Sequence, residues 1–167
     1  MKFEKIDICD MRDSFVHLIR DEWALLTAGE KDSYNTMTVS WGTLGELWGK
    51  DVVTVFVRPQ RYTYEFMEKN VNFTLSFFGS EYRKALSFCG SKSGRDFDKA
   101  KECGLTACEM GESVAFEEAK LVIACKKIAF ADMEPSKFIA PEIEDNYNNG
   151  DYHRAYIGEI TETCKKV

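Results

Sequence analysis

Two short segments of the chain, residues 35–42 and 57–64, carry most of the side chains that could do chemistry. The stretch 52–57 that runs into the second segment is rich in β-branched residues, which predicts a buried strand. Two neighbouring strands would place hydroxyls, guanidinium groups and a large aromatic ring close together. Such a set of groups suits a ligand with a phosphate at one end and a flat ring system at the other.

The first of these segments alternates between apolar and hydroxyl-bearing side chains, which predicts a strand at residues 35–41 with one buried face. Its hydroxyls could bond the phosphate or ring oxygens of a ligand, and its tryptophan could cover a planar ring. A sheet edge with solvent-facing hydroxyls and a core tryptophan is the open alternative. The apolar face would hold Met37, Val39 and Trp41, and the polar face Thr36, Thr38 and Ser40.

The turn that follows strand 52–57 is rich in groups that bind phosphate. Arg58 and Arg61 offer planar guanidinium groups that match phosphate oxygens. Pro59 cannot donate to a sheet ladder, so it ends the strand. Thr63 lies at the start of a predicted helix, where its hydroxyl and amide would meet an anion favoured by the helix dipole. Solvated arginines in an ordinary strand-to-helix connection remain the alternative.

A third candidate segment is the serine-glycine loop at residues 91–95, ahead of a short helix that begins at Arg95 or Asp96. Such a loop, flanked by cations, can cradle an anion. Lys99 lies one turn along the helix and could reach back toward the loop. A solvated polar loop between helices is the alternative reading. The helix should end near Cys103, with Gly104 just after it.

His153 is the last candidate, in the closing strand predicted at residues 152–160. A ring nitrogen there could meet a ligand phosphate or a substrate, while a satisfied or exposed histidine is the alternative. With only two histidines and no pairing of His and Cys at ligand spacing, the sequence predicts no metal site. It also holds no catalytic triad and no paired carboxylates, so no catalytic side chain is predicted.

The composition limits the classes of protein to which the chain can belong. At 167 residues it is most simply one domain, spanning residues 1–167. The formal charge of −6 argues against a general nucleic-acid binder. The charged start does not resemble a signal peptide, and no run of about 18 apolar residues predicts a membrane span. We therefore expect a cytoplasmic protein whose six cysteines are reduced thiols, with three disulfides as the alternative.

Strands outnumber helices in the predicted order and do not alternate with them. This pattern favours a mainly β fold with added α, an antiparallel barrel with short helices packed outside, over a doubly wound parallel sheet. No glycine-rich dinucleotide or Walker-type loop is present. The strands are expected at residues 22–29, 35–41, 52–57, 71–78, 114–116, 119–131 and 152–160, and the helices at 62–69, at 81–89 closed by Gly90, and after 95.

Taken together, the chain resembles the flavin reductase-like family of FMN-binding split-barrel proteins, which includes flavoredoxin. The order and spacing of five stretches carry this resemblance, and no single stretch would. The matching stretches are residues 35–42, 57–63, 73–77, 93–99 and 156–160.

The resemblance implies a six-stranded antiparallel Greek-key split β-barrel with short peripheral helices. It also implies a homodimer with FMN bound near the subunit interface. His153 is a looser match than the other implied cofactor-binding residues. These other residues are Asn35, Thr36, Met37, Thr38, Ser40 and Trp41 beside the flavin, Arg58, Pro59, Arg61, Tyr62 and Thr63 on the phosphate side, and Ser93, Gly94, Arg95, Asp96 and Lys99 from the helical insertion.

The activity implied by the resemblance is an FMN-dependent oxidoreductase that passes electrons from NADH or NADPH to an unknown acceptor. Two alternatives stay open. One is a flavoredoxin-like electron carrier without a nicotinamide site, and the other is a non-catalytic binding barrel. The segment 133–147 is predicted to be irregular, and a lid and a dimer contact are both open readings of residues 133–149.

Overall fold

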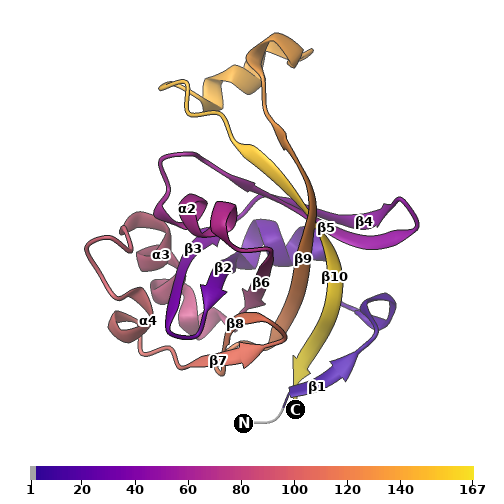
Figure 1. Ribbon diagram of the computed structural model, residues 1–167, viewed down its shortest axis with the longest axis vertical. Helices are drawn as coiled ribbons and strands as arrows, with labels where there is room; N and C mark the ends of the chain where they lie inside the picture. The colour runs from indigo at the N-terminus through magenta and orange to yellow at the C-terminus, as the bar shows by residue number, and fades with distance from the viewer. Residues whose placement is uncertain (1–2) are drawn as a thin grey trace.

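Eight antiparallel strands form one strongly curved sheet in the computed structural model of the chain, which describes residues 3–167 (Figure 1). The strand order is β3-β2-β6-β9-β10-β5-β4, and β1 pairs with the far end of β10. A separate two-stranded ribbon is formed by β7 and β8. The strands are β1 (Phe3–Ile6), β2 (Ala24–Glu30), β3 (Ser33–Val39), β4 (Gly42–Leu47), β5 (Lys50–Val57), β6 (Asn72–Phe77), β7 (Ala107–Met110), β8 (Ser113–Phe116), β9 (Leu121–Asp132) and β10 (Arg154–Lys166).

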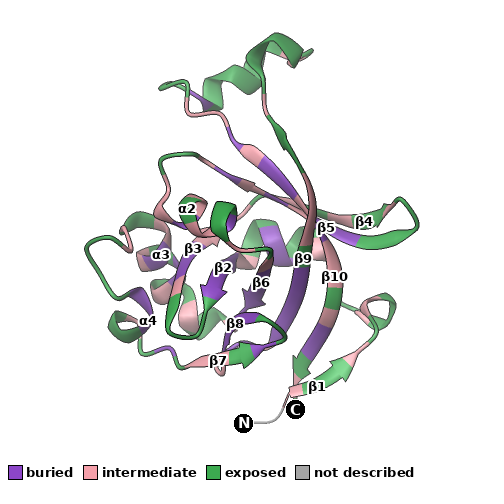
Figure 2. Ribbon diagram, in the orientation of Figure 1, coloured by how far each residue is buried: buried purple, intermediate pink, exposed green. Residues whose placement is uncertain are grey.

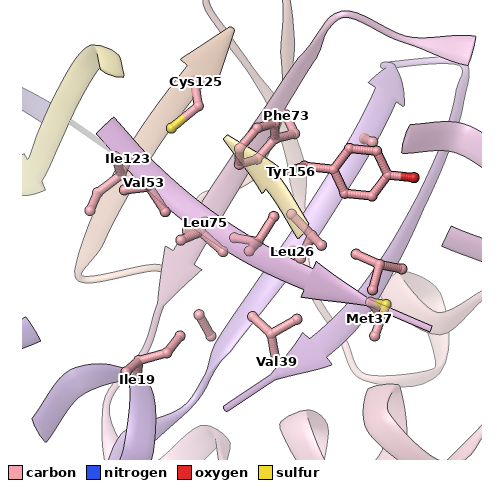
Figure 3. Packing of buried hydrophobic residues seen from close by; sticks show 14 of the residues in the cluster. Ile19, Leu26, Met37, Val39, Val53, Phe73, Leu75, Ile123, Cys125 and Tyr156 are labelled. Atoms are coloured by element: carbon pink, nitrogen blue, oxygen red, sulfur yellow. The ribbon is translucent and has the colours of Figure 1, made fainter. Parts of the chain in front are cut away.

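The sheet curls so far that strands distant in its order share one hydrophobic core (Figure 3). Met37 and Val39 of β3 belong to the same buried cluster as Val53 and Val55 of β5, although the four strands β2, β6, β9 and β10 lie between β3 and β5 in the sheet. Apolar side chains at alternate positions of each strand fill this interior, as the period of two requires. The resulting barrel confirms the predicted mainly β, antiparallel architecture.

A second core lies between the outer face of the sheet and the short helices. It joins Leu25 of β2 and Val122 of β9 to helix residues such as Leu86 and Cys89. Helices α3 and α4 are thereby fixed against the sheet, while α2 packs Met67 into the first core and contacts β2 and β3 (Figure 1). The helical segments are η1 (Ile8–Asp10), α1 (Phe15–His17), η2 (Leu18–Glu22), α2 (Tyr62–Lys69), η3 (Ser80–Tyr82), α3 (Arg83–Ser91), α4 (Lys99–Glu102), η4 (Pro135–Lys137) and η5 (Pro141–Asn146).

Residues 133–153, called the arm below, connect β9 to β10 and project away from the barrel (Figure 1). Most of the arm is exposed, as Figure 2 shows by its colour. Ile139 is 98% exposed, which is unusual for an apolar residue. The arm contains η4 and η5, so the prediction of an irregular segment there missed two short helical turns.

Three details of the predicted elements are wrong. The sheet has eight strands instead of six, because β1 and β4 extend it at its edges. Helix α3 continues through Gly90 to Ser91, so Gly90 does not end it. Trp41 does not share the core face of Met37 and Val39, because β3 ends at Val39 and the tryptophan is 45% exposed.

Other predictions of local structure are confirmed. Strands 35–41, 52–57 and 71–78 correspond to β3, β5 and β6, and helix 62–69 has the bounds of α2. Gly104 follows α4 with φ of +65°, a left-handed conformation that suits glycine after a helix. Within residues 3–167, no helix is both long and apolar enough to cross a membrane.

Candidate functional site

Strand β3 is the point at which the three candidate segments meet. The Asn35 side-chain amide donates to the Thr63 hydroxyl at 2.7 Å, which ties β3 to the start of α2. Gly94 lies against the same asparagine, and a Cβ atom at this position would come within 1.9 Å of the Asn35 side-chain oxygen. Glycine therefore lets the loop after α3 approach β3 closely. This contact brings the serine-glycine loop beside the arginine-proline turn.

The space between these segments is a cavity of about 530 Å³, called the main cavity below. Polar and cationic side chains dominate its wall, and Asp151 is the carboxylate among them. On a chain with a formal charge of −6, this local excess of cations favours an anion as the ligand of the cavity. The lining residues are Met37, Arg58, Gln60, Arg61, Tyr62, Thr63, Ser91, Lys92, Ser93, Gly94, Arg95, Lys99 and Asp151.

Lys99 is a buried cation in the wall of the main cavity, with 5% of its surface exposed. Its Nζ donates to the Thr36 carbonyl at 2.9 Å and to the Cys89 carbonyl at 2.8 Å. An ammonium group has three N–H donors, so one remains for a ligand. Burial, with the nearby Arg61 charge as a smaller cause, lowers the pKa of Lys99 to about 8.

Arg61 stands beside Lys99 and is anchored by the end of helix α3. Its Nη1 donates to the Gly90 carbonyl at 2.7 Å. Burial and the neighbouring Arg58 charge both lower the pKa of its guanidinium, although such a group stays protonated in proteins. Two cations held this close without a ligand repel each other, and an anion bound between them would relieve that repulsion.

Arg58 forms an ion pair and a hydrogen bond with residues of the arm. Its Nη1 forms an ion pair with Asp151 at 2.6 Å, and its Nη2 donates to the Asn146 carbonyl at 2.8 Å. The guanidinium also lies 5.2 Å from the centroid of the Tyr147 ring. Arg58 therefore positions the base of the arm at the edge of the main cavity, and its charge there is partly offset by Asp151.

A smaller cavity of about 170 Å³, called the side cavity below, opens next to the main one and shares Met37, Arg58 and Arg61 with it. Rings form much of its wall: the Trp41 and His153 ring centroids are 5.2 Å apart, and Phe56 lies 6.5 Å from His153. Ring-lined walls of this kind suit a flat ligand. The lining residues are Met37, Thr38, Val39, Ser40, Trp41, Phe56, Arg58, Arg61 and His153.

His153 is buried, and the hydrogen bond between its Nδ1 and the Tyr147 hydroxyl spans 2.8 Å. Burial lowers the pKa of His153 to about 4, with the Arg58 charge as the next cause. The ring is therefore neutral at physiological pH. It serves the side cavity as a flat, uncharged wall.

The predicted site residues fall into three groups. Most line the main or the side cavity. Asn35 and Thr36 line a neighbouring hollow with Lys99, while Pro59 and Asp96 are exposed and line none of these three. The Thr36 and Thr38 hydroxyls, expected to be available to a ligand, bond the protein instead. Thr36 donates to the Leu26 carbonyl, and Thr38 donates to the Leu86 carbonyl at 2.5 Å.

Several cavity residues were missed by the reasoning from sequence. Gln60 and Ser91 lie inside predicted segments and could have been named from their polar side chains. Phe56 alternates with buried valines along its strand, so it could have been placed on the opposite face. Asp151 gave no signal, because its partner Arg58 is 93 positions away in the sequence. No group of three or more metal-ligating side chains is arranged for a metal ion within the described part of the chain.

Comparison with solved structures shows the same fold in several flavoproteins. An FMN-binding domain of a flavin reductases-like enzyme from Shewanella baltica OS155 is 18% identical, with a TM-score of 0.70 over 98% of this chain and 77% of that chain. Flavoredoxin from Methanosarcina acetivorans is 22% identical, with a TM-score of 0.69 over 98% and 76%. An FMN-binding protein from Thermus thermophilus with bound 1-cyclohex-2-enone is 18% identical, with a TM-score of 0.68 over 98% and 79%.

These identities are low, so the structural matches establish the fold alone. No curated protein sequence matches the chain. The sequence profile of the flavin reductase like domain, however, matches residues 17–163, which is most of the chain. The match includes the turn, the loop and the strand that surround the main cavity. The chain belongs to the flavin reductase-like domain family.

Proposed function

We propose that the protein binds FMN and acts as an oxidoreductase that takes electrons from NADH or NADPH. One observation carries this proposal: three separated segments converge on a cation-rich main cavity that shares Met37, Arg58 and Arg61 with an adjacent ring-lined side cavity. A phosphate and a flat ring system joined in one molecule match these two environments. Membership of the flavin reductase-like family and the FMN-binding structural neighbours support the same ligand.

The residues of the main cavity fit the anionic end of FMN. Lys99 has a spare donor, and Arg61 offers a guanidinium fork. The amide groups of the loop at Ser93 and Gly94 add neutral donors beside them. Asp151 has a buried carboxylate oxygen without a hydrogen-bond partner among the described residues, which suits a hydroxyl-bearing chain between phosphate and ring.

The side cavity fits the ring end. Trp41, Phe56 and His153 provide flat surfaces, and Ser40 provides a hydroxyl at the rim. When bound, FMN would supply the chemistry, accepting a hydride from the nicotinamide and passing electrons to an acceptor. The protein's own residues would hold and orient the flavin and exclude water from the cavity walls. Because FMN would carry out the redox step, no acidic or basic side chain of the protein is required for it.

The reductase assignment is tested by mixing the FMN-loaded protein with NADH or NADPH without oxygen in a stopped-flow spectrometer. We expect the visible flavin band to bleach with at least one of the two nucleotides. An FMN-loaded protein that neither nucleotide bleaches would contradict the nicotinamide-dependent activity and favour the electron carrier. A protein that takes up no FMN would contradict both and favour a non-catalytic barrel.

Trp41→Ala should weaken binding of FMN and of riboflavin about equally, by roughly tenfold, because the lost ring contacts the part that the two ligands share. Trp48→Ala is the matched control, since Trp48 is 64% exposed in the turn between β4 and β5 and lines neither cavity. Titration of each variant with both flavins measures the effect. If the native protein and Trp41→Ala bind the flavins with equal affinity, the placement of the flavin ring in the side cavity is contradicted.

We also propose that residues 1–167 form one domain, and that the protein is a cytoplasmic homodimer with FMN near the interface. The exposed apolar side chains of Ile139 and Ile143 on the arm and of Phe130 at its base support a second copy as the partner. If the interface completes the site, dilution to the monomer should release FMN. Analytical ultracentrifugation with absorbance at the flavin band follows both events, and a monomer that keeps its full flavin content would contradict this placement.

A further inference from the structure

Two cysteines lie next to each other beside the main cavity. The Sγ atoms of Cys89, in helix α3, and Cys103, at the end of α4, are 3.9 Å apart. Cys89 is buried and Cys103 is half-buried, where its thiol also contacts the Ala85 carbonyl. Among the described residues, no other two thiols make such a contact. A disulfide would require this separation to shorten from 3.9 Å to roughly 2.05 Å.

The position of the pair in the chain links it to the cavity. The residues between the two cysteines include the loop 91–95 and Lys99, all of which line the main cavity. Lys99 is bonded to both ends of this segment: its Nζ donates to the Cys89 carbonyl at 2.8 Å, and its own carbonyl accepts the Cys103 amide at 3.1 Å. A bond between the cysteines would therefore close a loop around the cavity wall.

We propose that Cys89 and Cys103 form a reversible disulfide that fixes the 91–99 segment of the cavity wall. Closing the loop restricts the freedom of the intervening residues, as it does for any cross-linked loop. The cross-link itself depends only on the two thiols. Its effect on flavin retention rests on the proposed function.

The oxidant is a small-molecule disulfide of the glutathione class. The Cys103 sulfur, the more accessible of the two, loses its proton and attacks one sulfur of the reagent. The reagent's S–S bond breaks, and one thiol leaves with a proton. The Cys89 sulfur then loses its proton and attacks the Cys103 sulfur, forming the protein disulfide and expelling the second thiol. Two protein thiols are oxidised, and one reagent disulfide is reduced to two thiols.

Both cysteines are free thiols in the structure. Burial raises the pKa of the Cys89 thiol to about 12, and burial also raises that of Cys103. Both groups are therefore protonated at neutral pH, and the exchange is slow until oxidant is abundant.

The test treats the native protein with oxidised glutathione, blocks free thiols and maps tryptic peptides without reduction. We expect peptide 85–92 joined to peptide 102–120, two hydrogens lighter than the sum of the separate peptides, and released by dithiothreitol. Because 102–120 also holds Cys108, the map is repeated with Cys108→Ser, which should keep the cross-link. Cys103→Ser should abolish it. Glutathione found on Cys103 without closure to Cys89 would overturn the proposal.

Amide hydrogen exchange tests whether the disulfide fixes the cavity wall, and the rate of flavin release tests whether it affects flavin retention. In the oxidised protein, exchange of residues 91–99 should slow by about tenfold, whether or not flavin is present. Release of FMN should slow as well, and dithiothreitol should reverse both changes. Unchanged exchange after complete cross-linking would overturn the role of the disulfide in fixing the wall. If exchange slows but the protein binds no flavin, the disulfide proposal is supported and only the proposed function is contradicted.

Discussion

Replacing Lys99 by methionine should lower the affinity of the protein for FMN by about a hundredfold, while its affinity for riboflavin changes little. The Lys99 ammonium is buried in the wall of the main cavity and has one donor left after bonding two carbonyls. A charge-assisted hydrogen bond in such a place contributes about 1.5–3 kcal/mol. Riboflavin lacks the phosphate to which this donor is assigned.

The same substitution should leave the stability of the flavin-free protein nearly unchanged. Burial lowers the pKa of Lys99 from 10.5 to about 8, so below pH 8 its charge destabilises the folded state. This penalty fades as the pH rises from 8 toward 10.5, because the folded protein then holds the neutral amine. Methionine removes the penalty but leaves the Thr36 and Cys89 carbonyls without this donor, and each effect is on the order of 1–3 kcal/mol.

A pH profile adds an independent test of the same residue. FMN is a dianion above pH of about 6, so its binding favours the charged form of Lys99. Affinity should be constant from pH 7 to about 8 and then fall as the free protein loses the ammonium proton. The limiting slope is about tenfold per pH unit. In Lys99→Met this fall should disappear.

Lys101→Met is the matched control, because Lys101 is an exposed lysine of the same helix that lines neither cavity. Isothermal titration with FMN and riboflavin measures the affinities, and urea unfolding measures the stability. Equal losses in the two lysine variants would show a general charge effect. Equal losses of FMN and riboflavin affinity in Lys99→Met would contradict its assignment to the phosphate.

Arg61→Gln should also lower FMN affinity, by roughly 30- to 100-fold. Arg61 lines both cavities, and its guanidinium can bond a phosphate with two parallel donors. Glutamine keeps one amide donor but neither the charge nor the fork. Arg61→Lys, which restores the charge alone, should recover only part of the loss.

Arg20→Gln controls for the change in net charge, since Arg20 is exposed and pairs with Asp21 away from either cavity. Hydrogen exchange near Gly90 should increase in Arg61→Gln, because its carbonyl loses the Arg61 donor. Titration of the three variants with FMN checks the order of affinities. Full affinity in Arg61→Gln would place the phosphate elsewhere.

The secondary structure of the site segments was predictable because local patterns encode it. Alternating side chains in β3 and β6 meet the two-residue period of a half-buried strand. Strand β4 was not predicted, since Gly42 and Gly45 interrupt any alternation and most of the strand is exposed. The end of helix α3 was predicted wrongly because Gly90 was read as a helix-ending glycine. Gly90 instead lies inside the helix and packs closely against the Thr38 side chain, which explains the glycine at this position.

Contacts between distant segments were much harder to predict. No local pattern predicts that the Thr36 and Thr38 hydroxyls donate to backbone carbonyls of β2 and α3. Arg58 was expected to face a phosphate, yet the arm brings Asp151 and Tyr147 to it. The convergence of turn, loop and strand came from the family resemblance, because the order of the segments along the chain does not reveal which of them touch.

The most direct measurement is an equilibrium titration of the purified, flavin-free protein with FMN, read by the visible spectrum and by gel filtration. We expect saturable binding of one FMN per chain that is weakened in both Lys99→Met and Arg61→Gln and unchanged in Lys101→Met. A colourless protein that takes up no FMN from an excess would contradict it. So would FMN binding that neither cavity substitution weakens.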